Sequence, residues 1–137
     1  VEHLTLSHAT GGDPEGIKLR PAQGLEAVDY VLPGYNVWGS IIESLAAIGY
    51  DNSNVYSMSY DWRLSLAMLE ERDKYFTRLK AMMELSLKIH GVKAGVLAHS
   101  FGDTIFRYFL SWVESPHGGN AVHGWVEKHV AAFVNIC

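Results

Sequence analysis

A serine between two small residues is the strongest chemical signal in this sequence. Ser100 stands at the centre of residues 98–102, which read AHSFG. An apolar run at 94–98 precedes it, and a helix-like run at 104–110 follows it. This order of strand, tight turn and helix is typical of a nucleophile elbow, G-x-S-x-G in its general form. The turn needs small residues because it brings two backbones together, and Ala98 replaces the usual first glycine.

The elbow interpretation predicts what Ser100 and its neighbour do. A strained backbone at Ser100 lifts its hydroxyl clear of the sheet edge. The N–H of Phe101 lies at the helix start, where free donors and the helix dipole favour an oxyanion. The alternative is that Ser100 merely caps the helix, because serine is a good N-cap residue. Its place after a buried strand favours the nucleophile, since open α/β sheets bind ligands at that edge.

A second oxyanion donor is expected from the loop at residues 21–25. In an elbow-containing fold, the loop after an early strand supplies this backbone N–H. Gln23 is our choice for the donor. The alternative is an ordinary strand-to-helix loop.

The segment at residues 60–63, YDWR, also follows a predicted strand. It should therefore lie at the same ligand-binding edge. Trp62 could line an acyl pocket, and Arg63 could attract a phosphate headgroup. For Arg63 we favour an ion pair with Asp61, which is the more common role of such neighbours.

The histidines are not assigned as a general base. His99 is adjacent to Ser100 on a sharp turn, so the two side chains point apart, and we expect a packing role. We expect His117, His123 and His129 to be surface residues. His123 and His129 are six residues apart, no helical metal pair, and no cysteine joins them, so we predict no metal.

The remaining pattern alternates strands and helices. Apolar spacing and turn residues indicate strands at 17–20, 55–59, 94–98 and 130–134, and helices at 37–48, 69–87, 104–110 and 122–128, with turns at 33–34 and 116–120. Such alternation predicts an α/β fold with parallel strands and helices on both faces of the sheet.

Composition and charge narrow the function classes. The chain has 137 residues, 48% of them hydrophobic and 19% charged, with a formal net charge of −4. The negative charge argues against nucleic acid as a partner. No apolar run reaches the ~18 residues of a membrane span. Because the sequence begins without methionine and ends within a predicted strand, we interpret residues 1–137 as a fragment of one domain.

Several segments together resemble the lecithin:cholesterol acyltransferase family, and most closely its phospholipid:diacylglycerol acyltransferase branch. The segments are 1–6, 13–21, 27–30, 33–35, 37–38, 48–50, 60–65 and 99–102. The combination of YDWRLS followed at this distance by HSFG is specific. Residues 69–73 and 106–110 are more similar to the plant phospholipid:sterol acyltransferases.

The resemblance implies an α/β-hydrolase-like fold and acyl transfer in two steps, without a cofactor. Ser100 would take a fatty acyl group from a phospholipid, and diacylglycerol would accept it to form triacylglycerol. A sterol acceptor, a phospholipase A activity and an inactive lipid-binding homologue are the alternatives. The family's triad aspartate and histidine follow the serine, and no residue here matches their motifs. The resemblance also implies a membrane surface as partner and the endoplasmic reticulum membrane as location.

Two further features are the acid Asp103 and a set of apolar residues. Asp103 suits the first turn of a helix, but many family members carry an uncharged residue there. Its charge would weaken the oxyanion site, and it lies too near Ser100 to be the triad acid. Tyr35, Trp38 and Leu66 could touch lipid, although core packing is the simpler account.

Overall fold

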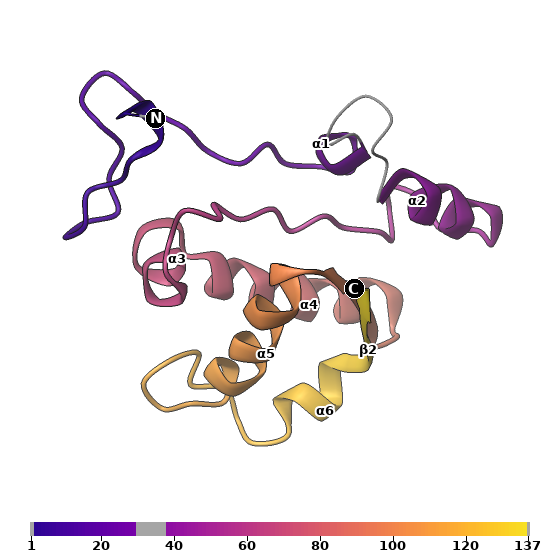
Figure 1. The fold of residues 1–137 in the computed structure, drawn as a ribbon. Coiled ribbons are helices and arrows are strands. Elements are labelled where there is room, and N and C mark those ends of the chain that lie inside the picture. Colours follow the sequence, from indigo (N-terminus) through magenta and orange to yellow (C-terminus); the bar gives the residue numbers. More distant parts are fainter. Residues whose placement is uncertain (1, 30–37, 137) are drawn as a thin grey trace. The chain divides into compact units, whose positions relative to one another are not determined.

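The computed structural model describes residues 2–29 and 38–136. These residues fall into two compact units, one formed by residues 1–5 with 13–62 and the other by residues 6–12 with 63–137. The first unit contains the 3₁₀ helix η1 (Glu2–Leu4) and the helices α1 (Glu26–Asp29) and α2 (Trp38–Ala47). The second contains α3 (Leu66–Asp73), α4 (Tyr75–His90), β1 (Ala94–His99), α5 (Phe101–Val113), α6 (Trp125–His129) and β2 (Val130–Ile136) (Figure 1).

The second unit is built around one parallel strand pair. β1 and β2 pair in parallel, with Leu97 opposite Val134 and His99 opposite Ile136. The chain passes from β1 to β2 through α5 and α6. This confirms the predicted parallel pairing and the predicted strands at 94–98 and 130–134.

Helix α5 carries the main apolar face of this unit. Ile105, Phe106, Phe109 and Val113 are all buried, at the spacing of one helical face. The Phe106 ring lies 4.8 Å from the ring of Phe133 on β2, measured between centroids. This contact fixes α5 against one face of the strand pair.

Helices α3 and α4 complete the core. Phe76 of α4 is fully buried, and its ring stacks 6.4 Å from that of Phe109. The sequence predicts one helix over residues 69–87, and this is wrong. Lys74 adopts a left-handed conformation with φ +51°, which ends α3 and starts α4. Gly91 ends α4 at φ +70°, a left-handed conformation that glycine adopts without steric cost.

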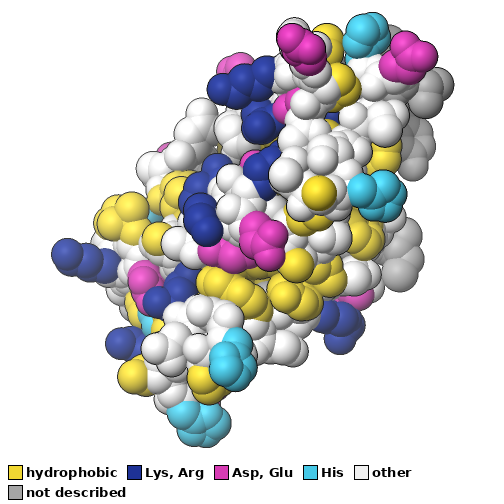
Figure 2. Space-filling model, turned by 90° about the vertical axis from the view of Figure 1, so that its left-hand side faces the viewer, with side chains coloured by type: hydrophobic (Ala, Val, Ile, Leu, Met, Phe, Trp, Pro, Cys, Tyr) yellow, Lys and Arg dark blue, Asp and Glu magenta, His cyan; other side chains and the backbone are white. Residues whose placement is uncertain are grey.

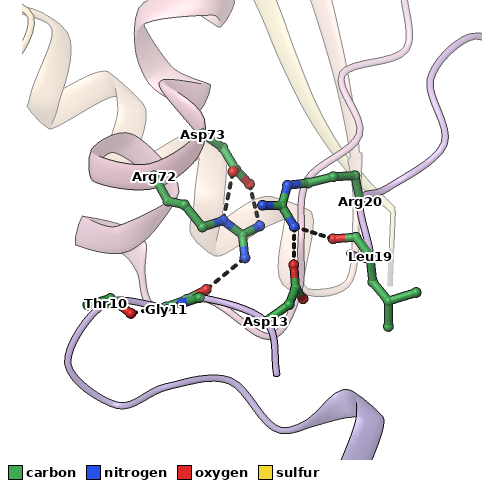
Figure 3. A network of polar contacts seen from close by, with 8 residues as sticks. Thr10, Gly11, Asp13, Leu19, Arg20, Arg72 and Asp73 are labelled. Carbon is green, nitrogen blue, oxygen red and sulfur yellow. Dashed lines mark hydrogen bonds and ion pairs between the residues drawn. The ribbon is translucent and has the colours of Figure 1, made fainter. Parts of the chain in front are cut away.

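A hydrogen bond from Arg72 connects the short segment 6–12 to α3. Arg72 donates to both carboxylate oxygens of Asp73, each at 2.7 Å, and its Nη1 donates to the Gly11 carbonyl at 2.9 Å (Figure 3). Gly11 has φ +64°, and a Cβ there would lie 2.8 Å from Leu64. Only glycine therefore fits this close approach.

In the first unit, the predicted strands at 17–20 and 55–59 are wrong. Both segments are irregular, although Arg20 forms an ion pair with Asp13 (Figure 3). Leu19 is 40% exposed and Tyr56 is 38% exposed, so the local alternation buries neither segment. A strand needs a hydrogen-bonded neighbour, which local pattern does not supply.

Other predictions are confirmed, and some concern residues outside the described ranges. The predicted helix at 37–48 is confirmed as α2. The one at 122–128 is observed as α6, which begins three residues later and ends one residue later. The turn at 33–34, Val37 and Tyr35 lie outside the described residues. On the face shown in Figure 2, basic and acidic side chains are interspersed with hydrophobic ones.

Candidate active site

Ser100 occupies the single residue between β1 and α5. Its backbone has φ +54° and ψ −123°, a conformation that costs a non-glycine residue of order 1–3 kcal/mol. The Ser100 N–H donates to the carbonyl of Ile136 at 3.3 Å, and the Ser100 carbonyl accepts from the Asp103 N–H at 3.0 Å. Strand β2 and helix α5 thus hold the strained residue from both sides.

The Ser100 hydroxyl does not cap the helix. Its side chain makes no capping hydrogen bond to α5, and the residue is exposed. The capping alternative is therefore wrong. Ser100 lies at the carboxyl end of a parallel strand and is an exposed residue, as a nucleophile requires.

Phe101 is the first residue of α5. Its backbone N–H belongs to the first helical turn, where donors have no partner within the helix. The side chain is 44% exposed. The geometry suits the predicted oxyanion donor, and the role itself stays a prediction.

Most of the other predicted substrate-site residues belong to the first unit. Gln23 is exposed, and its Nε2 donates to the Pro21 carbonyl at 3.0 Å. Trp62 is 71% exposed, whereas the neighbouring Asp61 is buried. Gln23, Asp61 and Trp62 belong to the first unit. Arg63 is half-buried and is the first residue of the segment 63–137 of the second unit. Their roles in acyl, phosphate or oxyanion binding stay predictions.

Asp103 has a partner that the sequence reasoning missed. Arg107 Nε donates to both Asp103 carboxylate oxygens, at 3.0 and 2.9 Å. The Arg107 guanidinium carbon also lies 5.6 Å from the centroid of the Phe133 ring. The i,i+4 spacing of acid and base on a helix is the signal that predicts this pair.

Three of the histidines lie in different settings from one another. His99 is half-buried on β1. His123 is fully exposed and contacts Glu114, with 3.2 Å between Nδ1 and Oε2. His129 was expected at the surface, and this is wrong. It is 5% exposed, its ring stacks 4.2 Å from that of Trp125, and its Nδ1 donates to the Trp125 carbonyl at 2.7 Å.

His117 lines a surface cleft of about 330 Å³ between α4 and the loop after α5, together with Glu84 and Trp112. Burial alone would raise the pKa of Glu84. Hydrogen bonds from the Trp125 indole at 2.8 Å and from Lys80 outweigh it, and the pKa is lowered. Trp112 and Ser100 lie at opposite ends of α5, roughly 18 Å apart along the helix axis. This cleft is therefore not assigned to the chemistry of Ser100.

The residues proposed above as possible lipid contacts are partly packed. Trp38 and Leu66, which begin α2 and α3, are both half-buried. Within residues 2–29 and 38–136, no three metal-ligating side chains gather in one place. In the same residues, no helix has the length and apolar character to cross a bilayer.

A strained, uncapped serine between a parallel strand and a helix defines an α/β protein with a nucleophile-elbow geometry. The chain belongs to the lecithin:cholesterol acyltransferase family, since the family model described as "Lecithin:cholesterol acyltransferase" matches residues 1–137. This confirms the resemblance inferred from the sequence motifs.

Phospholipid:diacylglycerol and phospholipid–sterol acyltransferases are among the named relatives of this chain. The chain is 52% identical over 136 residues to a phospholipid:diacylglycerol acyltransferase of Schizosaccharomyces pombe, covering 99% of this chain and 22% of that protein. It is 42% identical over 137 residues to the Saccharomyces cerevisiae protein of the same name, covering 98% and 21%. An Arabidopsis thaliana phospholipid–sterol O-acyltransferase is 37% identical over 122 residues, covering 85% and 19%. The chain thus spans about a fifth of the length of these relatives.

Proposed function

We propose that the protein transfers a fatty acyl group from a phospholipid to diacylglycerol, forming triacylglycerol through an acyl-serine at Ser100. The observation that carries this proposal is the exposed, uncapped Ser100 at φ +54°. The 52% identity to a phospholipid:diacylglycerol acyltransferase supports the choice of substrates.

The proposed chemistry has two steps. The Ser100 oxygen bonds to the ester carbonyl carbon while its proton passes to a general base, and the carbonyl oxygen becomes an oxyanion. The ester C–O bond then breaks, and the lysophospholipid leaves with the proton. The diacylglycerol hydroxyl attacks the acyl-serine in the same manner and releases Ser100. The base and its orienting acid are not assigned to residues of this chain.

The proposed site also includes four other residues that the sequence analysis predicts. The backbone N–H groups of Phe101 and Gln23 would bind the oxyanion, Trp62 would line the acyl pocket, and Arg63 would attract the phosphate headgroup or pair with Asp61. No cofactor or metal takes part.

We further propose an α/β-hydrolase-like, mostly parallel sheet with helices on both faces, of whose domain residues 1–137 form a part. Phe133 faces α5 on one side of the strand pair. The register partners Leu97 and Val134 are 37% and 47% exposed, which supports a second covering layer. The site of action would be a membrane surface, and the location the endoplasmic reticulum membrane.

A sterol is the second candidate acceptor, favoured by the 37% identity to the phospholipid–sterol O-acyltransferase. The full-length protein, given labelled phospholipid with diacylglycerol or sterol, separates the two. We expect labelled triacylglycerol. Sterol ester would favour the second candidate, and free fatty acid alone would show a phospholipase.

Covalent labelling tests the nucleophile itself. A serine-reactive lipid phosphonate should label the protein and leave Ser100→Ala unlabelled. Equal labelling of both proteins would remove Ser100 from the mechanism. A folded protein that is neither labelled nor active would indicate the inactive lipid-binding homologue.

A further inference from the structure

The first turn of α5 holds a negative charge close to where the proposed oxyanion forms. Asp103 is the third residue of α5, and its N–H donates to the Ser100 carbonyl at 3.0 Å. In the proposed mechanism the oxyanion forms beside this same turn, next to the backbone N–H of Phe101. An unneutralised carboxylate here would oppose the positive end of the helix dipole and repel the oxyanion.

Arg107 lies one turn further along α5 and covers this carboxylate. Its Nε contacts both Asp103 oxygens, at 3.0 and 2.9 Å. Its guanidinium lies over the Phe133 ring of β2, 5.6 Å from the centroid. The guanidinium is thus held by two elements, so its position relative to Asp103 is restricted.

This ion pair is not an important source of stability. The Arg107 side chain is 65% exposed and that of Asp103 is 20% exposed. Exposed pairs of this kind have little effect on the free energy of unfolding, because solvent screens them. Arg107 can still affect a nearby oxyanion through its charge, because this electrostatic effect does not require the ion pair to stabilise the fold.

We propose that Arg107 is a positioning residue for catalysis, which neutralises Asp103 and thereby keeps the first turn of α5 electropositive for the oxyanion formed when Ser100 attacks. This inference rests on the proposed function of Ser100. An uncompensated unit charge within one or two helical turns of the oxyanion should slow the reaction about three- to thirtyfold.

A charge-balance experiment in the full-length protein tests this. The variants are Arg107→Met, Asp103→Asn and the double variant, with Lys128→Met as control. Lys128 is an exposed cation of α6, which leads into the opposite end of the strand pair. We expect Arg107→Met to lower kcat about tenfold with KM nearly unchanged. The double variant with Asp103→Asn should recover most of the wild-type kcat. The control Lys128→Met should leave kcat unchanged.

Two further measurements separate charge from structure. Arg107→Lys keeps the cation but loses the planar stacking on Phe133, and it should keep most of kcat. Raising the salt concentration should reduce the defect of Arg107→Met, since ions screen exposed charges.

Three outcomes would overturn the inference: an unchanged kcat in Arg107→Met, a double variant as slow as Arg107→Met, or an Arg107→Lys variant that is equally slow. The last two would show that Arg107 acts through structure. Failure of the proposed function is seen separately, as phosphonate labelling or turnover that survives Ser100→Ala.

Discussion

Two helices of the second unit begin at a serine, and the two serines behave in opposite ways. Ser65, before α3, has φ −66° and ψ +161°, and its Oγ accepts a hydrogen bond from the Met68 N–H at 3.3 Å. Ser100, before α5, has φ +54° and makes no capping bond. Ser65 stabilises a helix end in an ordinary conformation. Ser100 occupies a strained conformation that leaves its hydroxyl available.

The comparison shows that residue type at a helix start does not determine its role. The difference arises from what precedes the serine. Ser65 follows an irregular segment that can adopt the extended backbone of an N-cap. Ser100 follows a hydrogen-bonded strand directly, and its N–H is held by Ile136 of β2. The chain must therefore reverse within one residue, and this forces the positive φ.

The largest expected effect is on activity. Ser100→Ala should lower acyl transfer at least about a thousandfold, because the nucleophilic oxygen is lost. Its unfolding midpoint should stay close to that of the wild type, since no capping bond is removed. Steady-state assays with thermal unfolding of the same samples check both points. A large loss of stability in Ser100→Ala would show that the hydroxyl has a structural role after all.

Helix α5 lacks a cap at its serine and must be held by its packed face. Phe109→Ala should lower the free energy of unfolding by about 3–5 kcal/mol, because a fully buried ring leaves a cavity. Denaturant unfolding measures this. The exposed Phe101→Ala, on the same helix, is the control and should cost much less. Equal costs would mean that the α5 packing is wrongly described.

Ser65→Ala should cost about 1 kcal/mol of stability, because the cap bond to Met68 is lost. The catalytic rate should be unchanged under conditions where the protein is folded. Parallel measurements of denaturant unfolding and turnover are needed. If Ser65→Ala reduced kcat as strongly as Ser100→Ala, the contrast between the two serines would fail.

Strain at Ser100 can be measured by comparing two inactive variants. Ser100→Gly should be more stable than Ser100→Ala by about 1 kcal/mol, because glycine adopts positive φ without steric cost. An Ala variant more stable than the Gly variant at position 100 would contradict the strained backbone.

The smallest effect concerns α6, a third kind of helix start. Its N-cap is Gly124, and the Val126 N–H donates instead to Glu114 Oε1 at 3.0 Å. That backbone hydrogen bond lowers the pKa of Glu114 from its ordinary value of 4.5. The stabilising effect is therefore complete above about pH 4.5 and is lost as the pH falls through the lowered pKa.

Glu114→Gln should accordingly be less stable than the wild type near neutral pH, and the difference should shrink in acid. Unfolding midpoints between pH 3 and 7 check this, with Glu127→Gln as the control for losing one acidic side chain of the region. A difference that grew in acid would reverse the assigned direction of the pKa shift.

Much of the second unit can be predicted from local sequence. The apolar run before Ser100, the face formed by Ile105, Phe109 and Val113, and the glycine stop at Gly91 all specify their elements directly. The family also follows from short motifs alone. The i,i+4 spacing of Asp103 and Arg107 equally predicts their ion pair.

What local sequence did not reveal depends on distant partners. Residues 17–20 alternate like a strand yet are irregular, because strand formation requires a neighbour that the pattern does not specify. The break at Lys74 and the burial of His129 depend likewise on packing between helices.

The geometry at Ser100 depends both on local sequence and on tertiary structure. Residue order alone determined that a serine, with small residues two positions before and after it, stands between a β-forming run and an amphipathic helix. Only the tertiary structure decided that this serine is strained and uncapped. The reason is that its N–H donates to the carbonyl of Ile136, which lies on a strand far along the chain. Side-chain periodicity depends only on residues close in sequence. Backbone strain persists only where separate elements hold a residue from both sides.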